Sequence, residues 1–181
     1  DDPSVRNLIT TTLKTNDYRY VVAPNGSAAI MEATSHNPEI ILLDLGLPDM
    51  DGVQVIQTVR SWSNVPIIVI SARSEDNDKI KALDAGADAV ICTHVSNVFG
   101  YRLPVEGIAA LCRRRGVPFV LDASQSAGML PVSMRELGAA FIAMPGHKGL
   151  YGPQGTGLLL CGHEAQPLLE GGTGSQSLLQ H

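Results

Sequence analysis

The stretch IILLDLGLPDMDG at residues 40–52 decides the fold. Its continuous apolar run ends at Asp44, and a turn rich in Gly, Pro and Asp leads into apolar residues at helical spacing. A second run, VPIIVIS at 65–71, is also followed by a helical pattern. Uninterrupted aliphatic runs that alternate with helices are typical of buried strands in a parallel sheet. This segment therefore predicts an α/β fold.

The same alternation continues in both directions along the chain. We predict seven strands separated by helices, at residues 20–23, 40–43, 66–70, 89–93, 118–122, 140–144 and 157–161. Repeated strand–helix units predict a three-layer αβα, doubly wound architecture with a mostly parallel sheet. No linker rich in Pro, Gly or Ser interrupts the middle of the chain. We therefore expect a single continuous domain.

Composition and charge narrow the class of protein. Of the 181 residues, 44% are hydrophobic and 17% are charged, which favours a packed core. The net charge is −5 and no apolar run is long enough to cross a bilayer, so we expect neither a nucleic-acid partner nor a membrane. Three widely spaced cysteines suit neither a disulfide framework nor a metal site and predict a cytoplasmic location. Residues 1–88 carry net charge −6 and residues 89–181 carry +1, a first sign of two origins.

Acidic residues mark the expected carboxyl edge of the sheet. Asp44 ends one predicted strand, Ser71 ends the next, and Asp1 and Asp2 open the chain. Strand ends converge in a parallel sheet, and clustered carboxylates need a cation such as Mg²⁺. Such a site can also take a phosphoryl group on one Asp. The alternative is that these residues are ordinary helix caps and turn residues.

Residues 1–88, with the two stretches quoted above and DNDKIKALDAGAD at 76–88, resemble the receiver domain of response regulators, of the type that controls the Kdp potassium-transport system. The resemblance implies a flavodoxin-like fold with Asp44 as phosphoacceptor and Ser71 as the switch hydroxyl. It implies that Mg²⁺ is held by Asp1, Asp2, Asp44 and Gly46.

Two features depart from that family. The first receiver strand, which would lie between the strands at 20–23 and 40–43, is absent from the sequence. The closing segment reads GADAVICTHV at 86–95, so Thr93 stands where the family has the Lys that neutralises the phosphoryl group. Phosphorylation chemistry is therefore expected to be impaired.

The sequence after residue 89 contains motifs that indicate a different chemistry. VPFVLDASQSAG at 117–128 places Asp122 at a strand end, and FIAMPGHKGLYGPQGTG at 141–157 places Lys148 after the next strand. An amine and a carboxylate at neighbouring strand ends are the pair that pyridoxal phosphate needs, for its Schiff base and its pyridine nitrogen. A lone Lys after glycine is otherwise a solvated loop residue.

This second part resembles the fold-type I, class V aminotransferases, and among them the cysteine desulfurase-like proteins. The resemblance implies that Lys148 forms the aldimine and that Asp122 pairs with the pyridine nitrogen. It also assigns Gln125 to the ring hydroxyl, His147 to the phosphate, and Asn97 to the ring or substrate. The loop GGTGS at 171–175 resembles one that approaches the cofactor phosphate across a dimer interface.

Neither family contains the motifs of the other. We therefore expect a receiver-like fragment (1–88) joined to a transferase-like fragment (89–181), with a shared sheet whose last strand is antiparallel. The start at Asp1 without Met favours an engineered fold chimera, with no evolved catalytic function and no required cofactor. The alternatives are residual pyridoxal phosphate binding through Lys148 and an impaired Mg²⁺-dependent phosphoacceptor at Asp44. Exposed apolar surface near residues 150–180, or a missing strand supplied by another copy, predicts self-association or a strand-swapped homodimer.

Overall fold

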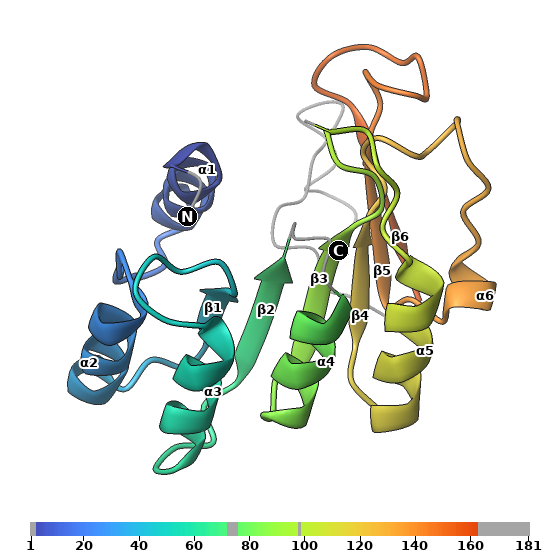
Figure 1. Ribbon diagram of the computed structural model, residues 1–181. Coiled ribbons are helices and arrows are strands. Elements are labelled where there is room, and N and C mark those ends of the chain that lie inside the picture. The colour runs from blue at the N-terminus through green and yellow to red at the C-terminus, as the bar shows by residue number, and fades with distance from the viewer. Residues whose placement is uncertain (1–2, 72–75, 98, 163–181) are drawn as a thin grey trace, which may run out of the picture.

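The computed structural model describes residues 3–71, 76–97 and 99–162. The helices are α1 (Pro3–Thr15), α2 (Gly26–His36), α3 (Gly52–Arg60), α4 (Asp76–Asp84), α5 (Val105–Arg115) and α6 (Met134–Leu137). The strands are β1 (Ile41–Asp44), β2 (Ile67–Ser71), β3 (Ala89–Thr93), β4 (Phe119–Asp122), β5 (Phe141–Pro145) and β6 (Gly157–Cys161). Helices and strands alternate from α2 to β5, with α1 before them and β6 directly after β5 (Figure 1).

All six strands form one sheet in the order β1-β2-β3-β4-β5-β6. The first five strands are parallel, whereas β6 runs antiparallel to β5. The α/β class, the mostly parallel sheet and the antiparallel last strand are therefore confirmed. The sheet is unbroken across residues 89–93, where we expected the two fragments to meet.

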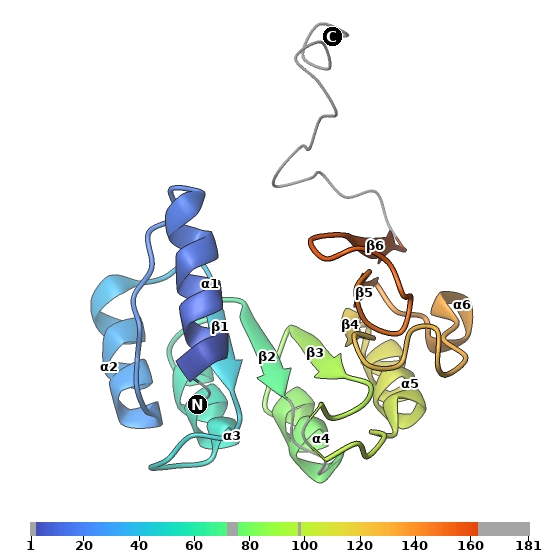
Figure 2. The same ribbon diagram turned by 90° about the horizontal axis from the view of Figure 1, so that it is seen from above.

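The core lies between the sheet and helices α3, α4 and α5, which line one face of it (Figure 2). Strand side chains alternate, so every second residue points to this face. The register aligns Val69, Val90 and Phe119 across three neighbouring strands, and each side chain is buried. Side chains at alternate positions, such as Ile68 and Ile91, are half-buried.

Local sequence explains where the covering helices begin and end. Asp51 caps α3 and forms a reciprocal capping box with Gln54, which satisfies amides at the helix start. Gly116 ends α5 with φ of 66°, a conformation that costs a glycine little. Basic residues of the last turn of α5 complement the helix dipole, as the Arg113–Arg115 run predicts.

The predicted strand at residues 20–23 is wrong. These residues are irregular, and the sheet begins at β1. Among the described residues, β1 is the end strand of the sheet, and no further strand lies beside it to pair with residues 20–23. Without such a partner their backbone has no ladder to join, and the side chains of Tyr20, Val21 and Val22 are 41%, 54% and 43% exposed.

Contacts between the two parts are formed by helices as well as strands. Helices α4 and α5 pack against each other on the covered face of the sheet. Arg115 of α5 donates to the carboxylate of Asp84 of α4. Val90 and Cys92 of β3 are buried between β2 on one side and β4 on the other. Among the described residues, no helix is both long and apolar enough to span a bilayer.

Candidate functional site

The carboxyl ends of the parallel strands place the predicted polar residues along one edge of the sheet. Asp44 ends β1, Thr93 ends β3 and Asp122 ends β4. The register pairs Thr93 with Asp122, and Asp122 with Ala143 of β5. Residues paired in this way project to the same face. The edge is therefore shared by residues that the sequence assigns to different families.

Around Asp44, the structure describes only part of the predicted magnesium site. The half-buried Asp44 carboxylate accepts a hydrogen bond from the N–H of Gly46 at 3.0 Å. Asp1 and Asp2 lie outside the described residues. Within residues 3–71, 76–97 and 99–162, no three His, Cys, Asp or Glu side chains are placed to share a metal ion. The magnesium ligands therefore stay a prediction.

Asp49 has a structural role that the sequence analysis missed. Its carboxylate accepts hydrogen bonds from the N–H of Gly26 at 2.7 Å and of Ser27 at 2.9 Å, and from Ser27 Oγ at 2.8 Å. The backbone N–H of Ser27, followed by that of Gly26, lowers the pKa of Asp49 from 3.8 to about 2. The anion also faces the positive end of the α2 dipole. In sequence, nothing distinguishes this residue from a turn Asp of the PDMDG segment.

Asp122 is held by its own turn. Its Oδ1 accepts hydrogen bonds from the N–H of Ser124 at 2.9 Å and from the Ser124 hydroxyl. The next residue of this turn is Gln125, whose Nε2 donates a hydrogen bond to Asn97 Oδ1 at 2.6 Å. This bond joins the loop after β4 to the loop after β3. The structure thus brings Gln125 and Asn97 together beside the strand that ends in Asp122.

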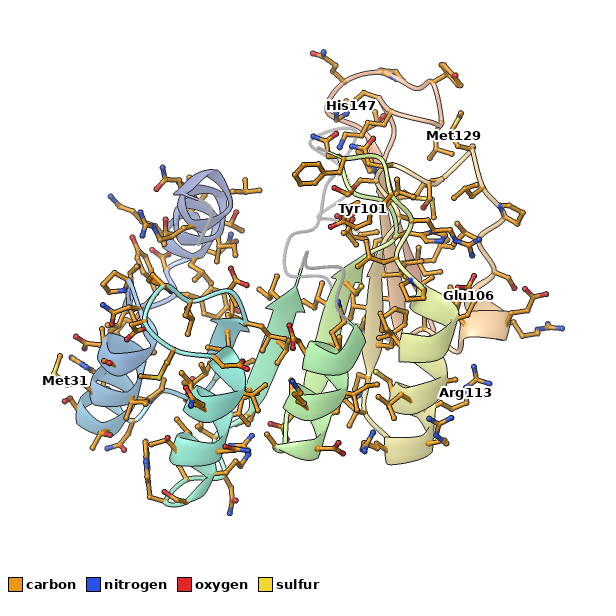
Figure 3. All side chains as sticks on the ribbon, in the orientation of Figure 1. Met31, Tyr101, Glu106, Arg113, Met129 and His147 are labelled. Carbon is orange, nitrogen blue, oxygen red and sulfur yellow. The ribbon has the colours of Figure 1, made fainter. Side chains whose placement is uncertain are left out.

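Lys148 and His147 lie on the loop between β5 and β6. Two glycines allow this loop to approach the β4 loop: a side chain at Gly149 would clash with the carbonyl oxygen of Ala127, and one at Gly128 with the carbonyl oxygen of Gly149. Lys148 is half-buried, whereas His147 is exposed at the far tip of the molecule (Figure 3).

A buried histidine network is a second feature that sequence reasoning missed. His94 is 1% exposed, and its Nδ1 lies 2.8 Å from the hydroxyl of the buried Ser126. Arg102 Nε donates to His94 Nε2 at 3.1 Å, so the ring proton is on Nδ1 and is donated to Ser126. Arg102 also pairs with Glu106. Burial, and then the charge of Arg102, lower the pKa of His94 below 6.5.

A small cavity lies beside His94. Its volume is about 100 Å³, and its lining is formed by His94, Val105, Glu106, Pro131, Ser133, Glu136 and Leu137. None of the five residues predicted to hold pyridoxal phosphate lines it. Pockets for ligands of that size typically occupy about 300–1,000 Å³. The cavity is therefore separate from the predicted cofactor site.

The residues present match a pyridoxal phosphate site in type but do not enclose one. An amine and two amides lie on loops at the sheet edge where the carboxylate of Asp122 ends β4, yet Asn97 and His147 are exposed to solvent. Gln125 and Asn97 bond to each other. The loop at 171–175, predicted to approach the cofactor phosphate, lies outside the described residues, so the pyridoxal phosphate site stays a prediction.

Comparison with known proteins identifies both parts of the chain. The family model of the response regulator receiver domain matches residues 1–96, and that of aminotransferase class-V matches residues 59–179. The chain belongs to both families. Their matches overlap at residues 59–96, which include β2, α4 and β3. Both resemblances noted in the sequence are confirmed, and the shared elements explain how two families can meet within one sheet.

Individual relatives agree with this division. The chain is 45% identical over 100 residues to the KDP operon transcriptional regulatory protein KdpE of Escherichia coli strain K12, covering 55% of this chain and 43% of that protein. It is 39% identical over 109 residues to a probable cysteine desulfurase of Methanothermobacter thermautotrophicus, covering 58% of this chain and 26% of that protein. The chain thus spans less than half of either relative.

A solved structure is similar over more of the chain. The apo structure of a cysteine desulfurase from Thermococcus onnurineus NA1 shares 26% identity with a TM-score of 0.49. The similarity covers 83% of this chain and 40% of that one.

Proposed function

We propose that this chain is an engineered fold chimera, in which a receiver fragment and a class V aminotransferase fragment share one core, and that it catalyses the reaction of neither family. The observation that carries the proposal is the unbroken sheet β1–β6, which crosses a segment that both family models match. A strand that suits both parents allows the fragments to join without a linker.

Thr93 supports the loss of receiver chemistry. It ends β3 at the sheet edge, where the receiver resemblance expects a Lys to neutralise the phosphoryl group on Asp44. A hydroxyl carries no charge, so it cannot stabilise the phosphoryl oxygens as an ammonium would. Within residues 3–71, 76–97 and 99–162, no group of three His, Cys, Asp or Glu side chains is placed to hold a metal ion.

The geometry around Lys148 supports the loss of transferase chemistry. Enzymes hold pyridoxal phosphate in a site that fixes the reactive carbon and excludes water. Here Lys148 is half-buried on a loop, and the neighbouring His147 is exposed. We expect no required cofactor, with loose binding at Lys148 as the alternative.

The transferase half of the proposal is tested with pyridoxal phosphate itself. The full chain is incubated with the cofactor, reduced with borohydride, and digested to locate the modified lysines by mass spectrometry. We expect Lys148 to be labelled no more than the exposed Lys81, and Lys148→Ala and Lys81→Ala to reduce total labelling equally. Selective labelling at Lys148, abolished only by Lys148→Ala, would contradict the proposal.

The receiver half is tested with acetyl phosphate and Mg²⁺. We expect the intact mass to show no added phosphoryl group in the parent chain, Asp44→Asn or Asp17→Asn. Phosphoryl mass present in the parent and in Asp17→Asn, but lost in Asp44→Asn, would show that receiver chemistry survives.

The net charge of the chain and its similarity to KdpE bear on its partners and its location. KdpE is a transcriptional regulator, but the net charge of −5 gives this chain no electrostatic attraction to nucleic acid. We propose a cytoplasmic protein without a nucleic-acid partner. A gel-shift experiment with random duplex DNA at low salt should show no complex.

A further inference from the structure

Strand β6 forms an open edge of the sheet, at the end opposite β1 (Figure 2). Among the described residues it pairs with β5 alone. All five of its residues are exposed, and Leu158, Leu159 and Leu160 are 56%, 60% and 40% exposed. Its sequence, GLLLC, contains no charge and no proline. Natural sheets commonly protect an edge strand with charged residues or proline, so within the described residues the sequence of β6 gives this edge neither protection.

The hydrogen bonds to β5 show which backbone groups face outward. The N–H of Gly146 donates to the carbonyl of Thr156, and the N–H of Gly162 donates to the carbonyl of Ala140. Hydrogen-bonded positions recur at every second residue of an antiparallel pair. In this register Leu158 and Leu160 therefore bond toward β5. The N–H and C=O groups of Gly157, Leu159 and Cys161 point to the open edge.

We infer that this edge binds a second copy of the chain, β6 against β6, antiparallel about a two-fold axis at Leu159. Gly157 then pairs with Cys161 of the second copy, and Leu159 pairs with its own equivalent. All outward backbone groups of the strand are satisfied in this register. Leu158 faces Leu160 of the second copy on one side of the joined sheet, and the two Leu159 side chains meet on the other side.

Charge favours β6 over the other edge as the self-pairing strand. An isologous contact places each residue opposite the same surface of its copy, so an uncharged strand meets no repulsion. Strand β1 is shorter and ends in Asp44, and the exposed Glu39 precedes it. Antiparallel self-pairing of β1 would bring Glu39 toward Asp44 of the second copy, and like charges opposite each other destabilise a ladder.

The experiment measures the mass of the full chain by analytical ultracentrifugation across a concentration series. We expect the mass to double as concentration rises. Leu159→Lys should keep the mass at that of one chain, because it places two ammonium groups opposite each other. Leu42→Lys on β1 and Leu8→Lys on α1 are matched exposed leucines and should leave dimerisation unchanged. A monomeric parent, a dimeric Leu159→Lys variant or a monomeric Leu42→Lys variant would overturn the inference.

Disulfide trapping tests the register. Leu159→Cys in a Cys161→Ser background should form an intermolecular disulfide on mild oxidation, because residue 159 faces its equivalent. Cys161 of the parent should not crosslink, since Gly157 of the second copy lies opposite it. Efficient crosslinking of the parent through Cys161, or none in the Leu159→Cys variant, would contradict the register.

Discussion

The guanidinium of Arg60 on α3 donates to the carboxylate of Asp88 at 2.6 Å, immediately before β3 begins. The same carboxylate oxygen accepts the N–H of Ile67, the first residue of β2, at 2.8 Å. Arg60 also donates to the carbonyl oxygens of Val65 at 2.7 Å and Gly86 at 3.1 Å. One ion pair therefore fixes the starts of β2 and β3, the two strands on which the shared sheet depends.

Removing this carboxylate should destabilise the fold. Asp88→Ala leaves the N–H of the buried Ile67 and the guanidinium of Arg60 without this acceptor, which should cost about 1–3 kcal/mol of unfolding free energy. Asp84→Ala removes an exposed ion pair with Arg115 and should cost about 0–1 kcal/mol. Urea unfolding of both variants measures the difference. Equal losses would show that the Asp88 bonds contribute nothing beyond a surface pair.

Thiol reactivity should distinguish one cysteine from the other two. Cys161 is exposed on β6, whereas Cys92 and Cys112 are 1% and 0% exposed. Burial raises the pKa of the Cys112 thiol to about 11, which removes the reactive thiolate near neutral pH. We expect Cys161 alone to react with a thiol reagent in the native protein, and all three in urea. Fast labelling of Cys112 in the native state would contradict the packing of α5.

The free energy of unfolding should fall in mild acid, where His94 becomes protonated. The folded state lowers its pKa below 6.5, so the unfolded chain binds more protons in this range. The contribution is therefore fully present above pH 6.5 and is lost as pH falls through the folded pKa. His94→Gln should flatten this slope of unfolding free energy against pH, while His147→Gln, at an exposed site, should retain it. An unchanged slope in His94→Gln would exclude His94 as the titrating group.

Asp49 should produce a second loss of stability in stronger acid. Its folded pKa of about 2 lies below its ordinary value of 3.8, so its contribution is present above pH 3.8 and disappears as pH falls toward 2. Asp49→Asn keeps one acceptor oxygen but removes the charge. We expect the parent to be the more stable protein at neutral pH, with the difference shrinking across this window. Thermal melting at several pH values measures it, and a constant difference would contradict the role of the charge.

Most of the fold could be predicted because the hydrophobic pattern is strong and local. Continuous aliphatic runs identified β1 to β5, and β3, α5 and β6 begin and end where the sequence predicted. The strand at 20–23 could not be judged in this way. Its residues are apolar and suited to a strand, but a strand also needs a neighbour to pair with, and the described part of the chain provides none for residues 20–23.

The candidate sites were less predictable, since they depend on loop geometry. The sequence placed Asp122 and Lys148 at neighbouring strand ends, and the resemblance added Gln125 and Asn97, which the structure brings within 2.6 Å of each other. It gave no signal for the bonds between His94 and Ser126, which lie 32 positions apart. The sequence did predict the antiparallel last strand and exposed apolar surface near residues 150–180, but only the register with β5 shows which backbone groups of β6 point outward.

The central claim is that one sheet joins both parts into a single cooperative unit. Its most direct test is urea unfolding of the parent and of the Leu121→Ala variant. Two probes monitor the transition: the fluorescence of Trp62, the only tryptophan, and the exposure of the Cys112 thiol. Leu121 is buried in β4, and its truncation should cost about 2–5 kcal/mol. We predict that both probes report one midpoint and that Leu121→Ala lowers it equally for both. A Trp62 transition that Leu121→Ala leaves unmoved would show two independent units and contradict the account.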